Sequence, residues 1–204
     1  MPSLQLHQLR VAAVAQTLCD GFVGELDSRA VLLACLFHDM GNIIKSDLSK
    51  FPDFVEPEGV AHWQLEKDAT ITKYGEDSHE ANVAIAREIG LPEKSIWLID
   101  NISFSQLENI VADENFERKI VEYADSRVGP HGVVSLEGRF ADALERYTSR
   151  YPNRADAEES YRRFAAWAKA IEQQVFGKVA MAPEDITEHS IQPLLEQLRG
   201  HLVH

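Results

Sequence analysis

Cysteine and long apolar runs are both scarce in this chain of 204 residues. Its two cysteines, Cys19 and Cys35, lie within apolar helical patterns, and two are too few for a disulfide framework, so we expect two buried thiols. The longest apolar stretch, 30–37, is far shorter than the roughly 20 residues that span a bilayer. No signal-peptide pattern precedes the first amphipathic segment. We therefore expect a cytoplasmic protein with no membrane partner.

Basic residues are also few: 20 Lys and Arg stand against 33 Asp and Glu, which leaves a net charge of −13. Proteins bind a nucleic-acid polymer through clustered Lys and Arg, so this charge argues against such a partner. The same charge repels small phosphate substrates unless a cation or a local basic group lies in the site. An anionic substrate would therefore point to a bound metal ion.

Strand-like alternation is almost absent, whereas helical spacing of apolar residues recurs throughout, so the predicted fold class is all-α. The segment 28–40 is apolar on nearly every face and should be the central buried helix. Two prolines and two glycines interrupt the segment 46–77, which predicts a long, partly helical connection of the kind that often forms a functional lid. The expected helices cover about 4–18, 28–40, 77–90, 93–101, 104–111, 115–128, 135–150, 155–176 and 184–203.

The chain divides at about residue 150 into a main domain, 1–150, and a C-terminal helical extension, 151–204. Apolar stripes follow both helices of the extension, and such stripes form packing surface. The extension therefore packs either on the main domain or in the interface of a homodimer. The stripes consist of Tyr161, Phe164, Ala168, Ile171 and Val175, and of Ile191, Leu194, Leu195, Leu198 and Leu202.

The most informative residues are His38 and Asp39, which directly follow eight apolar residues. Burying a carboxylate without a partner is unfavourable. The last turn of the expected helix also carries the negative end of the helix dipole, which disfavours a further negative charge. A divalent cation would offset both penalties on Asp39. The alternative is that Asp39 points to solvent or pairs with an arginine.

Two further polar residues are predicted to point inward. His7 lies on the same face of the first helix as Val11, where it is either a ligand or a satisfied core histidine. Asp125 has Val121 and Val128 about one turn away, so it is a second inward carboxylate on a separate helix. Aspartate suits such a position poorly unless it is paired.

Two imidazoles and two carboxylates from three helices form an oxygen-and-nitrogen donor set that suits Mn, Fe, Co, Ni or Mg as the divalent metal ion. Without thiolates, a closed structural zinc site is not expected. Open coordination positions would let the ion act as a Lewis acid and activate a water molecule. The predicted metal ligands are His7, His38, Asp39 and Asp125.

The order of these four residues resembles the H…HD…D signature of the HD superfamily of metal-dependent phosphohydrolases. The resemblance covers about residues 4–150, and it implies an HD-domain helical bundle, a bound metal ion and hydrolysis of a phosphate ester. The flanking sequences agree as well: 7–11 is similar to H-x-x-R-V, 34–41 to A-x-L-x-H-D-x-G, and 123–127 to Y-A-D-x-x.

His79 and Glu80 begin a helix of their own. The positive helix end favours the neutral imidazole that ligation or proton transfer needs, so His79 could support a metal ligand, contact the phosphate or act as a general acid/base. With His79 or Glu80 assisting proton transfer beside the metal ligand Asp39, the predicted catalytic residues are Asp39, His79 and Glu80. The alternative for His79 is a plain helix-start residue. In family members with two metals, a histidine in this region joins a second site together with a later histidine. This chain offers only Asn101 there, so we expect one ion, and neither a di-iron oxygenase nor a cyclic-dinucleotide phosphodiesterase.

A phosphoryl oxygen also needs positive or polar contacts beyond the metal. Lys45 and Asn42 closely follow the HD pair, whereas Arg127 comes two residues after the last ligand and Arg10 one turn after the first. These four residues are therefore the predicted substrate contacts. Each basic side chain could instead form a surface ion pair.

The predicted function is metal-dependent hydrolysis of a nucleotide or similar small phosphate ester. The alternative is a non-hydrolytic module that binds metal and nucleotide and signals through the C-terminal helices. A metal-free scaffold would leave two inward carboxylates, Asp39 and Asp125, without an explanation.

Overall fold

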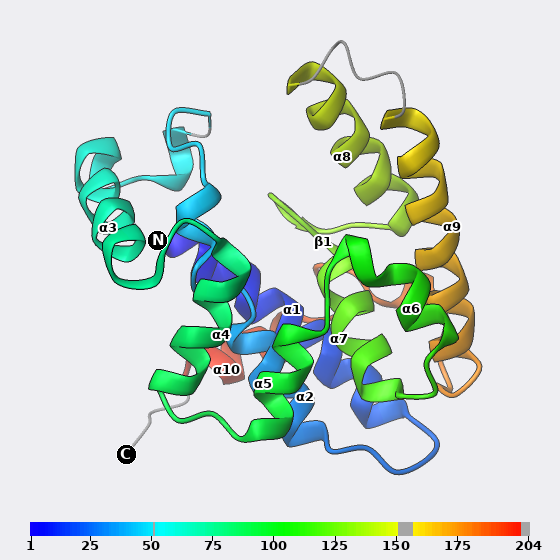
Figure 1. The fold of residues 1–204 in the computed structure, drawn as a ribbon. Helices are drawn as coiled ribbons and strands as arrows, with labels where there is room; N and C mark the ends of the chain where they lie inside the picture. Colours follow the sequence, from blue (N-terminus) through cyan, green and yellow to red (C-terminus); the bar gives the residue numbers. More distant parts are fainter. Residues whose placement is uncertain (51, 151–156, 201–204) are drawn as a thin grey trace.

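The computed structural model describes residues 1–50, 52–150 and 157–200. In these ranges the chain is mainly helical, with one small hairpin of β1 (Val128–Gly129) and β2 (Gly132–Val133), so the all-α prediction is confirmed (Figure 1). The α-helices are α1 Pro2–Gly21, α2 Ser28–Phe37, α3 Gly59–Tyr74, α4 Ser78–Glu88, α5 Glu93–Asp100, α6 Leu107–Ala112, α7 Phe116–Ser126, α8 Leu136–Arg150, α9 Ala157–Phe176 and α10 Gln192–Arg199. Short 3₁₀ helices are η1 Asn42–Lys45, η2 Pro52–Phe54, η3 Phe104–Gln106 and η4 Pro183–Asp185.

Helix α2 is the central helix and packs against α1, α5 and α7. Its sequence is apolar on almost every side, so it can contact three helices at once. Helix α1 contributes an unbroken buried run, Val11 to Ala15, whose small side chains suit close packing. Full burial of a residue such as Leu18 stabilises the fold by about 1.5–3 kcal/mol. The helices α1, α2 and α7 carry or adjoin all four predicted ligands, so the best-packed part of the molecule holds them.

Two of the predicted helix starts, near residues 28 and 77, are confirmed by their caps. The Asp27 carboxylate accepts a hydrogen bond from the backbone N–H of Ala30 at the start of α2. The Asp77 carboxylate accepts two, from the backbone N–H groups of Glu80 and His79, and these bonds lower the pKa of Asp77. Each such cap contributes about 1 kcal/mol.

The turn after α2 differs from the sequence prediction. Helix α2 ends at Phe37, with His38 as its C-cap, so the HD pair lies in the turn between α2 and η1 rather than inside the helix. Gly41 has a φ of −88°, so it does not provide the left-handed backbone of a C′ glycine. A Cβ atom there would lie 2.7 Å from the Cβ of Ala81 and 3.0 Å from the carbonyl oxygen of Ser78. Glycine therefore allows the HD turn to lie directly against α4.

The predicted connection 46–77 contains α3, and none of the residues of α3 is buried in the core. Two hydrogen bonds tie it to the preceding segment: Trp63 Nε1 donates to the carbonyl of Val55 at 3.1 Å, and Lys67 Nζ donates to that of Ser46 at 2.8 Å. In Figure 1 this helix stands at the edge of the molecule. No described helix, α3 included, is both long and apolar enough to cross a bilayer.

The C-terminal extension packs on the main helices, with α9 against α6, α7 and α8, and α10 against α1. The predicted helix 184–203 is corrected: η4 is followed by a turn in which Ser190 and Thr187 hydrogen-bond each other, and α10 begins only at Gln192. Proline in the first turn of α10 suits that late start. Residues 151–156 and 201–204 lie outside the described ranges, so the domain boundary at residue 150 stays a prediction. The homodimer also stays a prediction, because the structure describes a single chain.

Candidate metal centre

The four predicted ligands meet at one point. The Nε2 atom of His7, from α1, lies 3.1 Å from Oδ1 of Asp125, from α7, and 3.5 Å from Oδ2 of Asp39. The Nε2 atom of His38 lies 3.4 Å from the same Oδ1 of Asp125 and 3.6 Å from Oδ1 of Asp39. Each imidazole therefore faces both carboxylates. Residues that are up to 118 positions apart in the sequence form one compact cluster.

A backbone hydrogen bond on the side away from the cluster fixes the orientation of the His38 ring. Its Nδ1 donates a hydrogen bond to the backbone carbonyl of Cys35 at 2.9 Å, because a carbonyl oxygen can only accept. In the neutral ring, this bond leaves the lone pair on Nε2, a buried atom with no hydrogen-bond partner among the described residues. An outer hydrogen bond that orients a histidine in this way is typical of metal ligands. The imidazole is thus held with an acceptor atom facing two further acceptors, Asp39 and Asp125.

The electrostatics of the cluster call for a positive charge. Burial opposes the protonated form of His38, but the carboxylates of Asp39 and Asp125 outweigh it and raise the pKa of His38 to about 9. Burial alone would raise the pKa of Asp125, yet the imidazoles of His38 and His7 beside its carboxylate hold that pKa well below its usual range. Without a metal ion, a proton on His38 supplies the charge that a divalent cation would supply instead.

The donor set fits a divalent metal ion. The ligand atoms of His7, His38 and Asp39 all lie within 4.8 Å of one another, and Asp125 hydrogen-bonds into the same cluster. The side chain of His38 is only 4 % exposed, whereas those of His7 and Asp39 are 20 % and 19 % exposed, so the cluster opens to one side. Nitrogen and carboxylate donors with an open side suit a catalytic rather than a closed structural ion.

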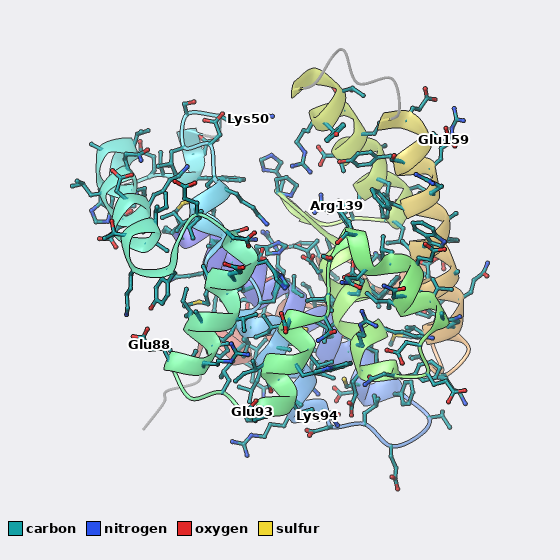
Figure 2. All side chains as sticks on the ribbon, viewed as in Figure 1. Lys50, Glu88, Glu93, Lys94, Arg139 and Glu159 are labelled. Atoms are coloured by element: carbon teal, nitrogen blue, oxygen red, sulfur yellow. The ribbon has the colours of Figure 1, made fainter. Side chains whose placement is uncertain are left out.

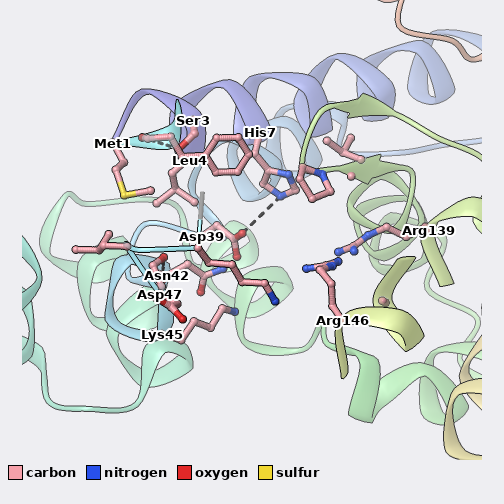
Figure 3. Close-up of a pocket in the computed structure, with 18 of the residues that line it drawn as sticks. Met1, Ser3, Leu4, His7, Asp39, Asn42, Lys45, Asp47, Arg139 and Arg146 are labelled. Atoms are coloured by element: carbon pink, nitrogen blue, oxygen red, sulfur yellow. Dashed lines mark hydrogen bonds and ion pairs between the residues drawn. The ribbon is translucent and has the colours of Figure 1, made fainter. Parts of the chain in front are cut away.

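The open side of the cluster faces a cavity of about 620 Å³, which His7 and Asp39 both line (Figure 3). Such a volume is typical of small-molecule sites. One wall comes from the segment 42–55, which includes Asn42 and Lys45. The other wall comes from β1, α8 and α9. Of the predicted connection 46–77, only its first part reaches the cavity lining.

Two predicted substrate contacts, Asn42 and Lys45, line the cavity as expected. The amide of Asn42 is buried, 3.5 Å from that of Asn82, whose Oδ1 also accepts from the backbone N–H of Gly41. Lys45 is exposed, and in Figure 3 it extends into the cavity from the side of Asp39. A cation and an amide are therefore available close to the proposed ligands.

The prediction of a phosphate contact is corrected for Arg127. Its guanidinium is buried and donates to the backbone carbonyls of Val134, Pro183 and Ile186 and to the hydroxyl of Tyr123. A guanidinium with so many structural acceptors joins α7 to the C-terminal extension instead of facing the cavity.

Arg10 is corrected in the same way, because it pairs with Glu188 at 2.8 Å. Glu188 also accepts a hydrogen bond from the backbone N–H of Val133, which ties α1, the hairpin and the extension together. Neither Arg10 nor Arg127 lines the cavity.

His79 and Glu80 are not brought to the cavity either. The Nε2 atom of His79 lies 3.1 Å from Oδ1 of Asp100, both side chains are nearly half exposed, and Glu80 is exposed. The side chain of Asn101 donates to the backbone carbonyl of Trp97. Among the described residues, no second group of metal-binding side chains forms here. The structure therefore leaves a catalytic contribution of His79 or Glu80 without geometric support.

Three basic residues of the lining, Lys50, Arg139 and Arg146, were not singled out from the sequence. Lys50 lies just before η2, whereas Arg139 lies on α8, closer to the middle of the molecule (Figure 2). The spacing of Arg139 and Arg146 places them on one face of α8, which the sequence does show. Nothing in the sequence indicates that this face turns toward the HD pair.

An all-helical protein with a His/Asp site for a divalent ion is the class that the fold and this centre define. A family model described as "HD domain" matches residues 5–148, so the chain belongs to the HD domain family, part of a superfamily of metal-dependent phosphohydrolases. The match ends close to the end of α8, as the predicted domain 1–150 does. No curated protein and no solved structure matches the chain.

Proposed function

We propose that the protein is a metal-dependent phosphohydrolase that acts on a nucleotide or a similar small phosphate ester. One observation carries the proposal: the His/Asp cluster opens into a cavity whose walls bear basic side chains, in a protein whose net charge is −13. A strongly acidic protein that gathers cations around one cavity provides a local site for an anion. The family match supports the same reaction class.

The cluster would hold one ion through the imidazole nitrogens of His7 and His38 and the carboxylates of Asp39 and Asp125. When bound, a divalent ion such as Mn, Fe, Co, Ni or Mg supplies Lewis-acid polarisation of a phosphoryl oxygen and lowers the pKa of a water molecule. The carbonyl of Cys35 keeps Nε2 of His38 aimed at the ion.

The residues beside the ligands would hold the substrate phosphate. Lys45 offers a positive charge, and Asn42 offers an amide on the same wall as Asp39. In the hydrolysis, the water oxygen forms a bond to phosphorus, the P–O ester bond breaks, and the ester oxygen leaves with a proton. Lys45 would stabilise the negative charge on the phosphoryl oxygens as the ester bond lengthens.

The test is elemental analysis of the purified protein, followed by a screen of phosphorylated nucleotides with the ion that is found. We expect about one equivalent of metal in the native protein, and loss of both metal and activity in Asp39→Asn. The matched control is Asp68→Asn, an exposed carboxylate on α3 outside the cavity, which should keep both.

Two outcomes would count against the proposal. An Asp39→Asn variant with normal metal content and activity would exclude the centre. A metal-loaded protein that returns every nucleotide unchanged would favour the alternative, a non-hydrolytic module that binds metal and nucleotide.

A further inference from the structure

The cavity has two basic walls on opposite sides. The near wall, formed by Asn42, Lys45 and Lys50, belongs to the segment that follows the HD pair. The far wall, formed by Arg139, Arg146, Tyr147 and Tyr161, belongs to α8 and α9. In Figure 3 the side chains of Arg139 and Arg146 extend from α8 toward Asp39 and His7, opposite Lys45.

The far wall is one continuous face of α8. Arg139, Ala143, Arg146 and Tyr147 all line the cavity, and their spacing of four, three and one residues puts them on the same side of a helix. The neighbouring residue Phe140 is buried in the core, so the helix cannot rotate this face away without exposing an aromatic ring. The two guanidinium groups are therefore presented to the cavity by the packing of α8.

Both arginines are held in place by contacts along α8. Arg146 donates from Nε and Nη2 to the carboxylate of Asp142, at 2.9 and 2.6 Å. The Nη1 atom of Arg139 lies 4.0 Å from the same carboxylate, and its guanidinium lies 5.8 Å from the centre of the Phe104 ring. The Nε atom of Arg139 is buried, and no residue in the described part of the chain hydrogen-bonds to it. The single negative charge of Asp142 thus lies beside two positively charged guanidinium groups, so a net positive charge faces the cavity.

A single phosphate does not account for this arrangement. The phosphate that undergoes hydrolysis would lie at the ligand cluster, where Lys45 and Asn42 on the near wall already meet it. The cavity of about 620 Å³ is larger than a phosphate needs, and aromatic rings of Phe104, Tyr147 and Tyr161 also line it. Arginine pairs are suited to bidentate recognition of a phosphate, and aromatic faces suit a flat ring.

We propose that Arg139 and Arg146 bind a second phosphate group of the substrate, distant from the ester bond that is hydrolysed. This inference rests on the proposed function and narrows its substrate class to a nucleotide that carries at least two phosphoryl groups, with its base near the aromatic side chains of the cavity. The second group lies either in a diphosphate chain or on another position of the ribose, and both share the chemistry that the far wall recognises.

The experiment compares adenosine 5′-monophosphate, adenosine 5′-diphosphate and adenosine 3′,5′-bisphosphate as ligands. Dissociation constants are measured by titration calorimetry with protein stripped of metal, so that no turnover occurs, and kcat/KM is measured with the metal-loaded protein. We expect at least one of the two doubly phosphorylated ligands to bind about tenfold more tightly than the monophosphate.

The variants Arg139→Gln and Arg146→Gln should each remove most of that preference, while monophosphate binding changes less than about twofold. Arg163→Gln on α9 is the matched control, because it removes the same charge from an exposed residue outside the cavity and should keep the preference. Arg146→Lys should retain part of the preference, since lysine keeps the charge but cannot donate two parallel hydrogen bonds to one phosphate as a guanidinium does. Unchanged thermal unfolding of the variants shows that α8 is intact.

The proposal is overturned if neither doubly phosphorylated ligand is preferred, or if the arginine variants weaken all three ligands equally. Its failure is distinguishable from failure of the proposed function. Turnover without a far-wall preference keeps the hydrolase and removes the subsite. A preference that Arg146→Gln removes, in a metal-loaded protein without turnover, keeps the subsite and removes the hydrolase.

Discussion

Two His–Asp pairs in this molecule share the same separation and differ in everything around it. His7 and Asp125 lie 3.1 Å apart, and so do His79 and Asp100. The first pair is partly buried between α1 and α7, and the second links α4 to α5 with both side chains nearly half exposed. Distance between the two groups therefore does not distinguish a metal centre from a surface contact.

The surroundings distinguish the two pairs. Around His7 and Asp125 a second histidine and a second carboxylate complete the cluster, and a backbone carbonyl fixes the acceptor atom of His38. That concentration of acceptors in a partly buried place is unfavourable without a cation. His79 and Asp100 can be hydrated, so neither needs a further partner.

The strongest test of this difference removes one carboxylate from each pair. We expect Asp125→Asn to weaken Mn²⁺ or Co²⁺ binding by at least about 100-fold, because a ligand matters more than the outer contacts whose loss costs 10- to 100-fold. Asp100→Asn should leave the affinity unchanged, since its carboxylate lies outside the cavity. Titration with a competing chromophoric chelator measures both. Equal effects of the two substitutions would contradict the distinction.

The pH dependence of metal affinity is the second test. Ligation requires the neutral form of His38, whose pKa is about 9 in the metal-free protein. Well below that pH each bound ion must displace one proton, so affinity should rise about tenfold per pH unit; the rise levels off near the pKa and totals about 50-fold from pH 7 to pH 9. Calorimetry in buffers of different ionisation enthalpy should show about one proton released per ion at pH 7.5. An affinity that is flat over this range would contradict the electrostatic account of the cluster.

The third test concerns the stability of the metal-free protein. Folding raises the pKa of His38 from 6.5 to about 9, so its contribution is fully present below pH 6.5 and is lost as the pH rises through 9. We expect the free energy of unfolding to fall by about 1–3 kcal/mol over this window, measured by urea denaturation in the presence of a chelator.

Buried Glu122 gives a control for that measurement. Burial, followed by the charge of Asp125, raises the pKa of Glu122 from 4.5 to about 8, so its contribution also falls with pH, but between 4.5 and 8. Glu122→Gln should flatten the decline below pH 8 and keep the decline between 8 and 9. His38→Gln should remove the decline in unfolding free energy between pH 8 and 9. A decline that persists in this variant would have to come from another group.

Local sequence patterns were enough to predict most helices and the meeting of the four ligands. Helical periodicity shows where a helix runs, and the capping residues Asp27 and Asp77 show where α2 and α4 begin. Both signals come from residues close together in the sequence. The inward direction of His7 and Asp125 followed from their apolar neighbours on the same helix face. The family motif then supplied the link between the three helices.

Features that depend on tertiary packing could not be predicted in this way. The sequence places Arg127 beside a ligand, but only the fold reveals the backbone carbonyls of the C-terminal extension that use its guanidinium. Conversely, Arg146 is distant in the sequence from every motif, and it reaches the cavity because α8 packs against α9. Charge alone did not distinguish a structural arginine from one that faces a ligand.

The smallest expected effect belongs to the exposed pair itself. A double-mutant cycle of His79→Gln and Asp100→Asn should give a coupling free energy below about 1 kcal/mol in urea denaturation at pH 6, because solvent screens charges that are nearly half exposed. The coupling should decrease further in 1 M salt, where the screening length is about 3 Å. The same cycle on His7→Gln and Asp125→Asn in metal-free protein should give a larger coupling that salt changes little, since that pair is less accessible to ions. A coupling at His79 that rises on addition of Mn²⁺ would make this pair a second metal site and end the contrast between the two.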